Sequence, residues 1–240
     1  MQKLQINIIR TYLLITFLLV VSGILFPANQ SLWLFRYFTI LTLFLIAIFL
    51  KVKRRIQTLL PYAILFASIG DAFLYLNMPL KFIRLNIPLG LLSFTIAYLI
   101  IASVYFRALH KLKKSSAKHF YQVQLILLIF IISIFIYFLQ RINMGHLIFG
   151  AVFVFALLLV FCTALNLFFS TTFPTRLRLL IFISSTLMLI CDTGVIMGFS
   201  IPNLDSIVYS LGASIVWSAY IPAWTIICIL SMDTEFSKIS

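Results

Sequence analysis

The chain is a succession of long apolar runs separated by short polar segments. A run of about 20 apolar residues is long enough to cross a bilayer as a helix. Eight such runs are present, approximately over residues 8–26, 32–50, 57–76, 85–106, 120–139, 146–169, 179–200 and 206–230. None alternates between apolar and polar residues as a barrel strand does, and a lipid-embedded backbone must satisfy its own hydrogen bonds. We therefore predict an all-α, polytopic membrane protein of about eight transmembrane helices that forms one domain over residues 1–240.

Composition supports this prediction. Of the 240 residues, 63% are hydrophobic and 10% are charged, whereas a soluble domain has roughly 45–50% apolar and about 25% charged residues. The net charge of +13 does not indicate nucleic-acid binding, because the basic residues lie in short loops between the runs. The three cysteines, Cys162, Cys191 and Cys228, lie in apolar runs without metal-ligand spacing, so we expect small packing residues, no metal and no cofactor.

The distribution of basic residues predicts the topology. Fourteen of the 18 Lys and Arg residues lie on the side that holds the N-terminus, and the other four are Arg36, Lys81, Arg84 and Arg141. Positive charge accumulates on the cytoplasmic side of membrane proteins, so we expect both termini in the cytoplasm. The Ile-, Phe- and Lys-rich usage is typical of an AT-rich bacterial genome, which indicates the inner membrane of a bacterium.

Two acidic residues lie well inside apolar runs. The chain has five acids, of which Asp205 falls in a polar turn and Asp233 and Glu235 fall in the C-terminal tail. The other two, Asp71 and Asp192, lie roughly 20 Å along helices that start on the same side. An ionisable residue inside the membrane indicates a functional site. The equal depth favours one shared site, although two separate polar helix contacts would also explain it.

A weak internal repeat relates the two acidic helices. An offset of 121 residues aligns Asp71 with Asp192, and an offset of 122 aligns Gly90, Ala97 and Tyr98 with Gly212, Ala219 and Tyr220. Two parallel four-helix halves would produce this pattern, and sites in such folds often form where the halves meet. A few identities in apolar sequence can also arise by chance.

Seven further residues are candidates for substrate binding. Polar side chains flank the aspartates or follow them on the next helix, where helix–helix contact is the simpler explanation. Two cations lie beyond the outer end of the first acidic helix and could bind a lipid phosphate or snorkel to the interface. The candidates are Ser68, Tyr75, Tyr98, Ser185 and Tyr220, together with the cations Lys81 and Arg84.

Two neighbouring carboxylates in a site of low dielectric ionise at different pH values. One can then remain protonated as a general acid while the other acts as a general base. This arrangement suits acid-initiated cleavage with water as the nucleophile, and it equally suits a proton relay in a transporter. The residues alone leave both open.

Three segments carry a family resemblance. Residues 65–74, LFASIGDAFL, resemble the S-x-x-G-D-x-x-L motif of the YhhN-like lysoplasmalogenase family, with one residue fewer between Ser and Gly. Residues 90–97, GLLSFTIA, resemble the next motif, G-x-x-x-F-x-x-A, and Asp192 is similar in position to the aspartate of a later F-x-x-S-D motif. The resemblance covers most of the chain, with eight spans of similar spacing.

The resemblance implies a membrane hydrolase that cleaves the vinyl-ether bond of lysoplasmalogen, giving a fatty aldehyde and a glycerophospho-head group without a metal. Carried over by position, Asp71 and Asp192 would be the acid–base pair. Protonation of the vinyl ether at carbon would give an oxocarbenium-like centre, and the second carboxylate would direct water onto it.

The sequence also departs from the family pattern. Tyr98 stands where the family usually has His, and Ile101 stands where it has Tyr. Cys191 precedes the second aspartate in place of Ser, and the last helix, around Tyr220, contains no Gln. Three functions stay open: a lysolipid hydrolase, a non-enzymatic lipid-binding or regulatory protein, and a proton-coupled small transporter. A transporter would need a continuous polar path, and no third buried acid in the sequence extends one.

Overall fold

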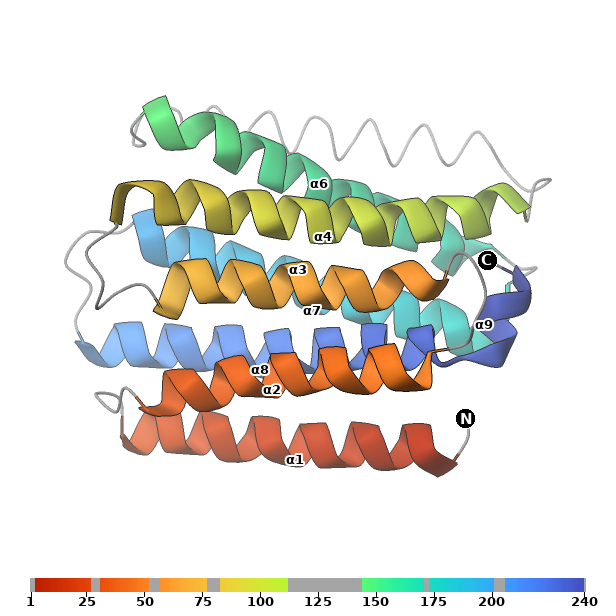
Figure 1. Ribbon diagram of the computed structural model, residues 1–240, viewed down its shortest axis with the longest axis horizontal. Coiled ribbons are helices and arrows are strands. Elements are labelled where there is room, and N and C mark those ends of the chain that lie inside the picture. The colour runs from red at the N-terminus through yellow and green to blue at the C-terminus, as the bar shows by residue number, and fades with distance from the viewer. Residues whose placement is uncertain are drawn as a thin grey trace.

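The computed structural model describes residues 3–26, 31–51, 57–76, 83–111, 144–170, 173–200 and 206–239. Within these ranges the chain forms helices and no strands (Figure 1). The helices are α1 (Lys3–Leu25), α2 (Ser31–Leu50), α3 (Leu60–Asp71), α4 (Ile83–Lys111), α6 (Met144–Phe169), α7 (Thr175–Ser200), α8 (Ser206–Ser231) and the short α9 (Thr234–Ile239). A 3₁₀ turn, η1 (Gln57–Leu59), precedes α3, and a π-helical turn, η2 (Ala72–Leu76), follows it.

Seven of the eight predicted spans coincide with these helices to within a few residues. The predicted third span, 57–76, is composite, because it joins η1, α3 and η2. The predicted fifth span, 120–139, lies outside the described residues. The prediction of an all-helical polytopic fold is therefore confirmed over the part of the chain that the structure describes.

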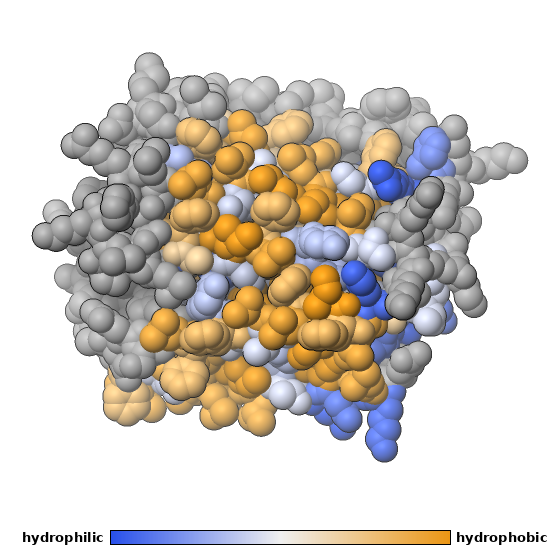
Figure 2. Space-filling view, viewed as in Figure 1, coloured by the Kyte–Doolittle hydropathy of each residue, from blue (hydrophilic) through white to orange (hydrophobic). Residues whose placement is uncertain are grey.

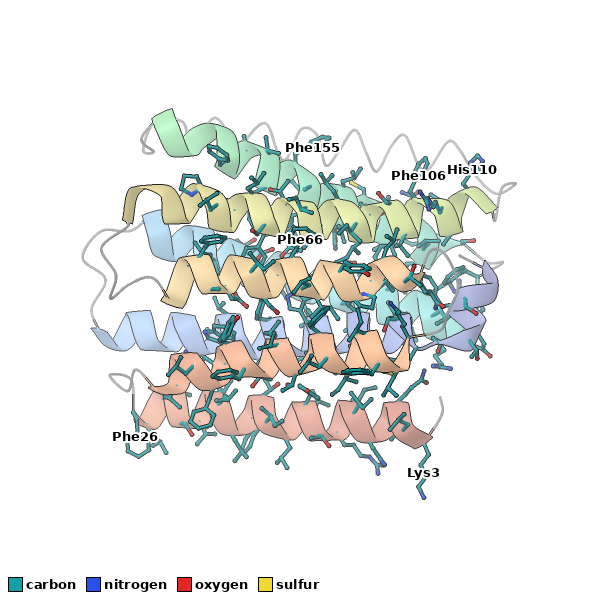
Figure 3. All side chains as sticks on the ribbon, in the orientation of Figure 1. Lys3, Phe26, Phe66, Phe106, His110 and Phe155 are labelled. Atoms are coloured by element: carbon teal, nitrogen blue, oxygen red, sulfur yellow. The ribbon has the colours of Figure 1, made fainter. Side chains whose placement is uncertain are left out.

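The outer surface of the helix bundle is apolar between its two ends. We define the end that carries Lys3 and α9 as the terminal end, and the end at which α1 finishes as the far end (Figure 1). Lys3 and His110 lie at the terminal end and Phe26 lies at the far end (Figure 3). In Figure 2 the middle of the visible face is apolar, and hydrophilic residues gather toward the terminal end. Six helical segments in the described ranges are long and apolar enough to span a membrane, so the chain is a multi-pass membrane protein.

Helix α8 lies at the centre of the bundle. It packs against α1, α2, α3 and α7, and 78% of its spanning window is buried. The buried indole of Trp224 and the buried ring of Tyr220 both belong to this helix. Groups from several helices can therefore meet at α8, and one face of it forms part of the candidate site.

The same pattern of helix–helix contacts occurs in the N-terminal and the C-terminal part of the chain. Helix α3 packs against α2 and α4, and α7 packs against α6 and α8. Between the two sets, α4 contacts α6 and α8 contacts α2. The paired helices α2 and α6, α3 and α7, and α4 and α8 each run in the same direction (Figure 1). These relations are those expected of two parallel halves.

A polar cluster joins the elements at the terminal end. Asp233 is 2% exposed, and its Oδ2 lies 2.5 Å from Nη2 of Arg176. Its Oδ1 accepts hydrogen bonds from the backbone N–H groups of Glu235 and Phe236 and so caps α9. The amide nitrogen of Gln57 donates to the Leu230 and Asp233 carbonyls at 2.9 and 2.8 Å. Asp233, which falls in the C-terminal tail of the sequence, is therefore buried, because an arginine and a helix terminus satisfy its carboxylate inside the protein.

Candidate active site

Gly70 allows α3 and α4 to approach each other beside Asp71. A Cβ built at Gly70 would lie 2.7 Å from two ring carbons of Phe94, so the space above the glycine is filled by that ring. Small residues permit this kind of close helix contact in membrane proteins. A similar contact occurs in the second half, where a Cβ at Gly194 would lie 2.8 Å from Cγ2 of Val216. Each aspartate thus lies beside a tight helix–helix contact.

The α-helical part of the third span ends at Asp71, and the next five residues form the π-helical turn η2. Short π-helical turns within helices occur frequently at functional sites, because they change the direction in which the following side chains point. An uninterrupted α-helix would place Ser68, Asp71 and Tyr75 on one face, and that spacing does not continue through this turn. The side chain of Tyr75 lies outside the described part of the structure.

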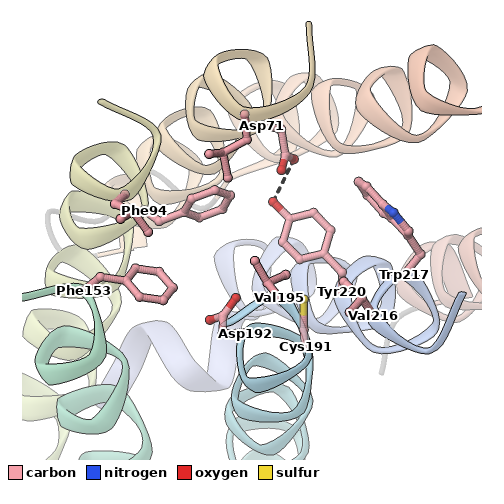
Figure 4. A pocket seen from close by; sticks show the side chains of 11 residues that line it. Asp71, Phe94, Phe153, Cys191, Asp192, Val195, Val216, Trp217 and Tyr220 are labelled. Atoms are coloured by element: carbon pink, nitrogen blue, oxygen red, sulfur yellow. Dashed lines mark hydrogen bonds between the residues drawn. The ribbon is translucent and has the colours of Figure 1, made fainter. Parts of the chain in front are cut away.

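Asp71 and Asp192 line one cavity of about 50 Å³ (Figure 4). A cavity of this size holds one water molecule or a few. The two carboxylates are 2% and 4% exposed and reach the cavity from α3 and α7. The other lining residues are Leu74, Leu91, Phe94, Phe153, Cys191, Val195, Val216, Trp217 and Tyr220. The site therefore combines two acids with mostly apolar walls.

A tyrosine from the opposite half holds each aspartate. The Tyr220 hydroxyl of α8 donates to Oδ2 of Asp71 over 2.8 Å, as the dashed line in Figure 4 shows. The Tyr98 hydroxyl of α4 donates to Oδ2 of Asp192. Helix α4 follows the helix of Asp71 and α8 follows the helix of Asp192, so the two hydrogen bonds cross between the halves. Hydrogen bonds to a charged group are among the stronger ones in proteins.

Packed rings fix the orientation of both tyrosines. Tyr98 stacks on Trp224, with ring centroids 6.3 Å apart and planes 10° apart. Tyr220 packs edge-on against Trp224 and Phe94, at 6.1 and 6.3 Å. The ring of Phe153, from α6, lies 5.7 Å from that of Tyr98. These contacts restrict the tyrosines to the orientations in which their hydroxyls reach the carboxylates.

Two of the predicted substrate-binding residues are buried away from the cavity. The Ser68 hydroxyl donates to the Ile64 carbonyl within α3 at 3.0 Å, so its described contact is local. Ser185 is 1% exposed and lies near the Tyr105 hydroxyl, two turns from Asp192 on the side of the terminal end. Neither is among the residues that line the cavity.

The two predicted cations could not be placed in the site. Lys81 lies outside the described residues, and Arg84 belongs to the first turn of α4 with its side chain outside them. A different cation is buried near the cavity: Arg36 of α2 is 3% exposed. The sequence shows it as a charge inside an apolar run, which is a signal for a functional residue. In the sequence its charge contributed only to the prediction of topology.

Phe153 is one of the site residues for which the sequence offered no signal. It is one of several phenylalanines in an apolar run, and its place beside Tyr98 follows from how α6 packs against α4. Phe94 and Cys191 fell within the motif-like segments, and the structure shows that both line the cavity. The cavity thus contains one of the positions, Cys191, at which the sequence departs from the resembled motif.

These features define a class of protein: polytopic helical membrane proteins with two buried carboxylates on one intramembrane cavity. A sequence model of the YhhN family matches residues 31–230, and the chain belongs to this family. The matched region includes both aspartates and both tyrosines of the site. No curated protein and no solved structure matches the chain.

Proposed function

We propose that this protein hydrolyses the vinyl-ether bond of a lysoplasmalogen-type lysolipid within the membrane, with Asp71 and Asp192 as the acid–base pair. The observation that carries the proposal is the apolar cavity that both carboxylates line. Membership of the YhhN family supports it. A space of this size holds one water molecule or a few, so most of the lysolipid, including its fatty chain, would lie outside it.

The chemistry uses one protonated and one ionised aspartate. The protonated carboxyl group transfers its proton to the second alkenyl carbon, and the ether oxygen stabilises the cation that forms on the first. The ionised carboxylate accepts a proton from water as the water oxygen bonds to the first carbon. The resulting hemiacetal collapses to a fatty aldehyde and a glycerophospho-head group. General acid–base assistance of this kind contributes typically about 10²–10⁴-fold.

Tyr98 and Tyr220 are positioning residues in this scheme. Each hydroxyl donates to Oδ2 of one aspartate, and Asp192 also has a side-chain hydrogen bond with Cys191. The apolar walls exclude bulk water, which would otherwise compete for the cationic intermediate. We also propose that the terminal end faces the cytoplasm of a bacterial cell, since it carries most of the basic residues.

The test is fatty-aldehyde release from lysoplasmalogen by purified full-length protein in detergent. The variants are Asp71→Asn and Asp192→Asn, each nearly isosteric with the wild type. Glu235→Gln serves as the matched control, because its carboxylate is 57% exposed at the terminal end. We expect release by the wild type and the control, and a loss of at least about 10²-fold in each aspartate variant.

Absence of release from a folded wild-type sample, across vinyl-ether, alkyl-ether and ester lysolipids, would overturn the proposal. Release that survives both aspartate substitutions would exclude the paired-acid mechanism. The first result would favour the lipid-binding or proton-transport hypothesis, whereas the second would leave a hydrolase that uses other residues.

A further inference from the structure

Arg36 is a buried cation in a helix of the membrane-spanning bundle. Its side chain is 3% exposed, and it lies five residues after Ser31, where α2 begins at the far end. At 1.5 Å per residue this is about 7 Å into the helix. Burying arginine in a membrane is costly, and such residues typically take part in substrate binding or ion movement.

Residues of α1 and α8 surround the guanidinium. Gly23 of α1 leaves space for it, because a Cβ at that position would lie 2.5 Å from Nη2 of Arg36. The same Cβ would lie 3.3 Å from the Ser214 hydroxyl of α8. The guanidinium carbon lies 5.3 Å from the centre of the Trp217 ring, a favourable cation–π distance. The glycine, the hydroxyl and the indole face form a site shaped around this one cation.

Trp217 connects this site to the cavity. Its indole lines the cavity with Asp71, and its ring packs edge-on against Tyr220 at 5.2 Å. Tyr220 in turn donates to Asp71. Figure 4 shows Trp217 and Tyr220 side by side on α8, below Asp71. The guanidinium and the reacting carboxylate are therefore separated by two aromatic side chains of one helix.

We propose that Arg36, with Ser214 and Trp217, binds the phosphate of a lysolipid whose ether end lies in the cavity. This inference rests on the proposed function and names the group by which its substrate is held. A guanidinium presents a planar set of N–H donors that matches phosphate oxygens, and a serine hydroxyl adds a further donor. A lysolipid carries its phosphate and its ether oxygen on the two end carbons of one glycerol, so a molecule whose phosphate binds Arg36 keeps its ether group within a few bonds of that site. The sequence predicted Lys81 and Arg84 for this role; Lys81 and the side chain of Arg84 lie outside the described residues, and Arg36 is a buried cation within them.

The experiment measures binding without turnover. Full-length protein in detergent is titrated with 1-O-alkyl-glycerol-3-phosphate, with 1-O-alkylglycerol, and with inorganic phosphate. The saturated ether cannot be protonated to an oxocarbenium ion, so the assay does not depend on hydrolysis. We expect Arg36→Gln to weaken binding of the alkyl glycerophosphate by about 10- to 100-fold and to leave alkylglycerol binding unchanged.

Two further variants separate phosphate binding from packing. Gly23→Ala keeps the charge of Arg36 but places a methyl group against the guanidinium. Like Arg36→Gln, it should therefore weaken binding of the alkyl glycerophosphate. This variant carries the test if Arg36→Gln does not fold. Arg107→Gln, which removes an exposed cation at the terminal end of α4, is the matched control and should leave both affinities unchanged.

Equal weakening of both lipids would overturn the inference, because it would show a structural role for Arg36. Unchanged binding of the alkyl glycerophosphate in Arg36→Gln would also overturn it. Binding of inorganic phosphate as tight as that of the alkyl glycerophosphate would make free phosphate the ligand and exclude the lipid. Arg36-dependent lipid binding without aldehyde release would sustain this inference while refuting the proposed reaction.

Discussion

The contact between Gly70 and Phe94 gives the sharpest prediction for stability. In Gly70→Ala the new Cβ would lie 2.7 Å from Cδ2 and Cε2 of Phe94 and 3.2 Å from Cγ. Carbon atoms pack optimally at about 3.5–4.0 Å, so the ring has to move. It cannot move freely, because the rings of Phe153, Tyr98 and Tyr220 surround it at centroid distances of 6.3–6.4 Å. Overpacking of this kind costs about 1–3 kcal/mol.

Gly150→Ala is the matched control. Gly150 lies within α6, and a Cβ there would meet nothing within 4 Å. Both substitutions gain the same helix propensity, up to about 1 kcal/mol, so the difference between them isolates the clash. A difference of about 1–3 kcal/mol corresponds to about 2–12 °C in Tm for a chain of this size. Thermal unfolding in detergent, followed by circular dichroism, measures it.

A second substitution tests the cause. Phe94→Leu removes the ring atoms that the new methyl group would meet, so Gly70→Ala should cost less in that background than in the wild type. A double-mutant cycle measures this coupling. A Tm of Gly70→Ala equal to or above that of Gly150→Ala, or a cycle without coupling, would refute the packing argument.

Two other predictions concern the polar contacts. Tyr98→Phe and Tyr220→Phe each remove one hydrogen bond to a carboxylate, worth about 1.5–3 kcal/mol, so aldehyde release should fall by about 10- to 150-fold. Tyr62→Phe, the control, changes a side chain that is 42% exposed and should leave aldehyde release unchanged. An equal fall in all three variants would contradict a positioning role for Tyr98 and Tyr220. Asp233→Ala removes the contact to Arg176 and the cap of α9, so limited proteolysis should cut α9 faster and Tm should drop. Glu235→Gln loses only the exposed ion pair with Arg176 at 3.8 Å and should behave as wild type.

The aspartates were the most predictable part of the site. Their depth follows from the length of each run and the rise per residue, because both helices start at the same end of the bundle. Whether they share a cavity depends on how each helix is rotated about its axis. That rotation is set by contacts such as Gly70 against Phe94, which depend on how the surfaces of two helices fit together and leave no periodic signal in the sequence.

Long-range partners also explain what the sequence did not predict. Asp233 follows the last apolar run and so falls in the C-terminal tail, but it is buried, and its partner Arg176 lies 57 positions away. Gln57, whose amide donates to the Asp233 carbonyl, lies 176 positions away. Arg36 was visible as a charge in an apolar run, yet its surroundings come from α1 and α8. Hydropathy reports the length and depth of a span and carries no information about such partners.

The crossed hydrogen bonds have a consequence for biosynthesis. Asp71 precedes its donor Tyr220 by 149 positions. At a synthesis rate of roughly 5–20 residues per second, about 7–30 s pass between the two. During this interval the nascent chain holds a membrane-embedded acid whose native donor has not yet been made, so it needs water, a proton or an insertion factor in its place. A chain truncated before α8 would keep this acid without its native donor permanently, a defect that membrane quality control could recognise.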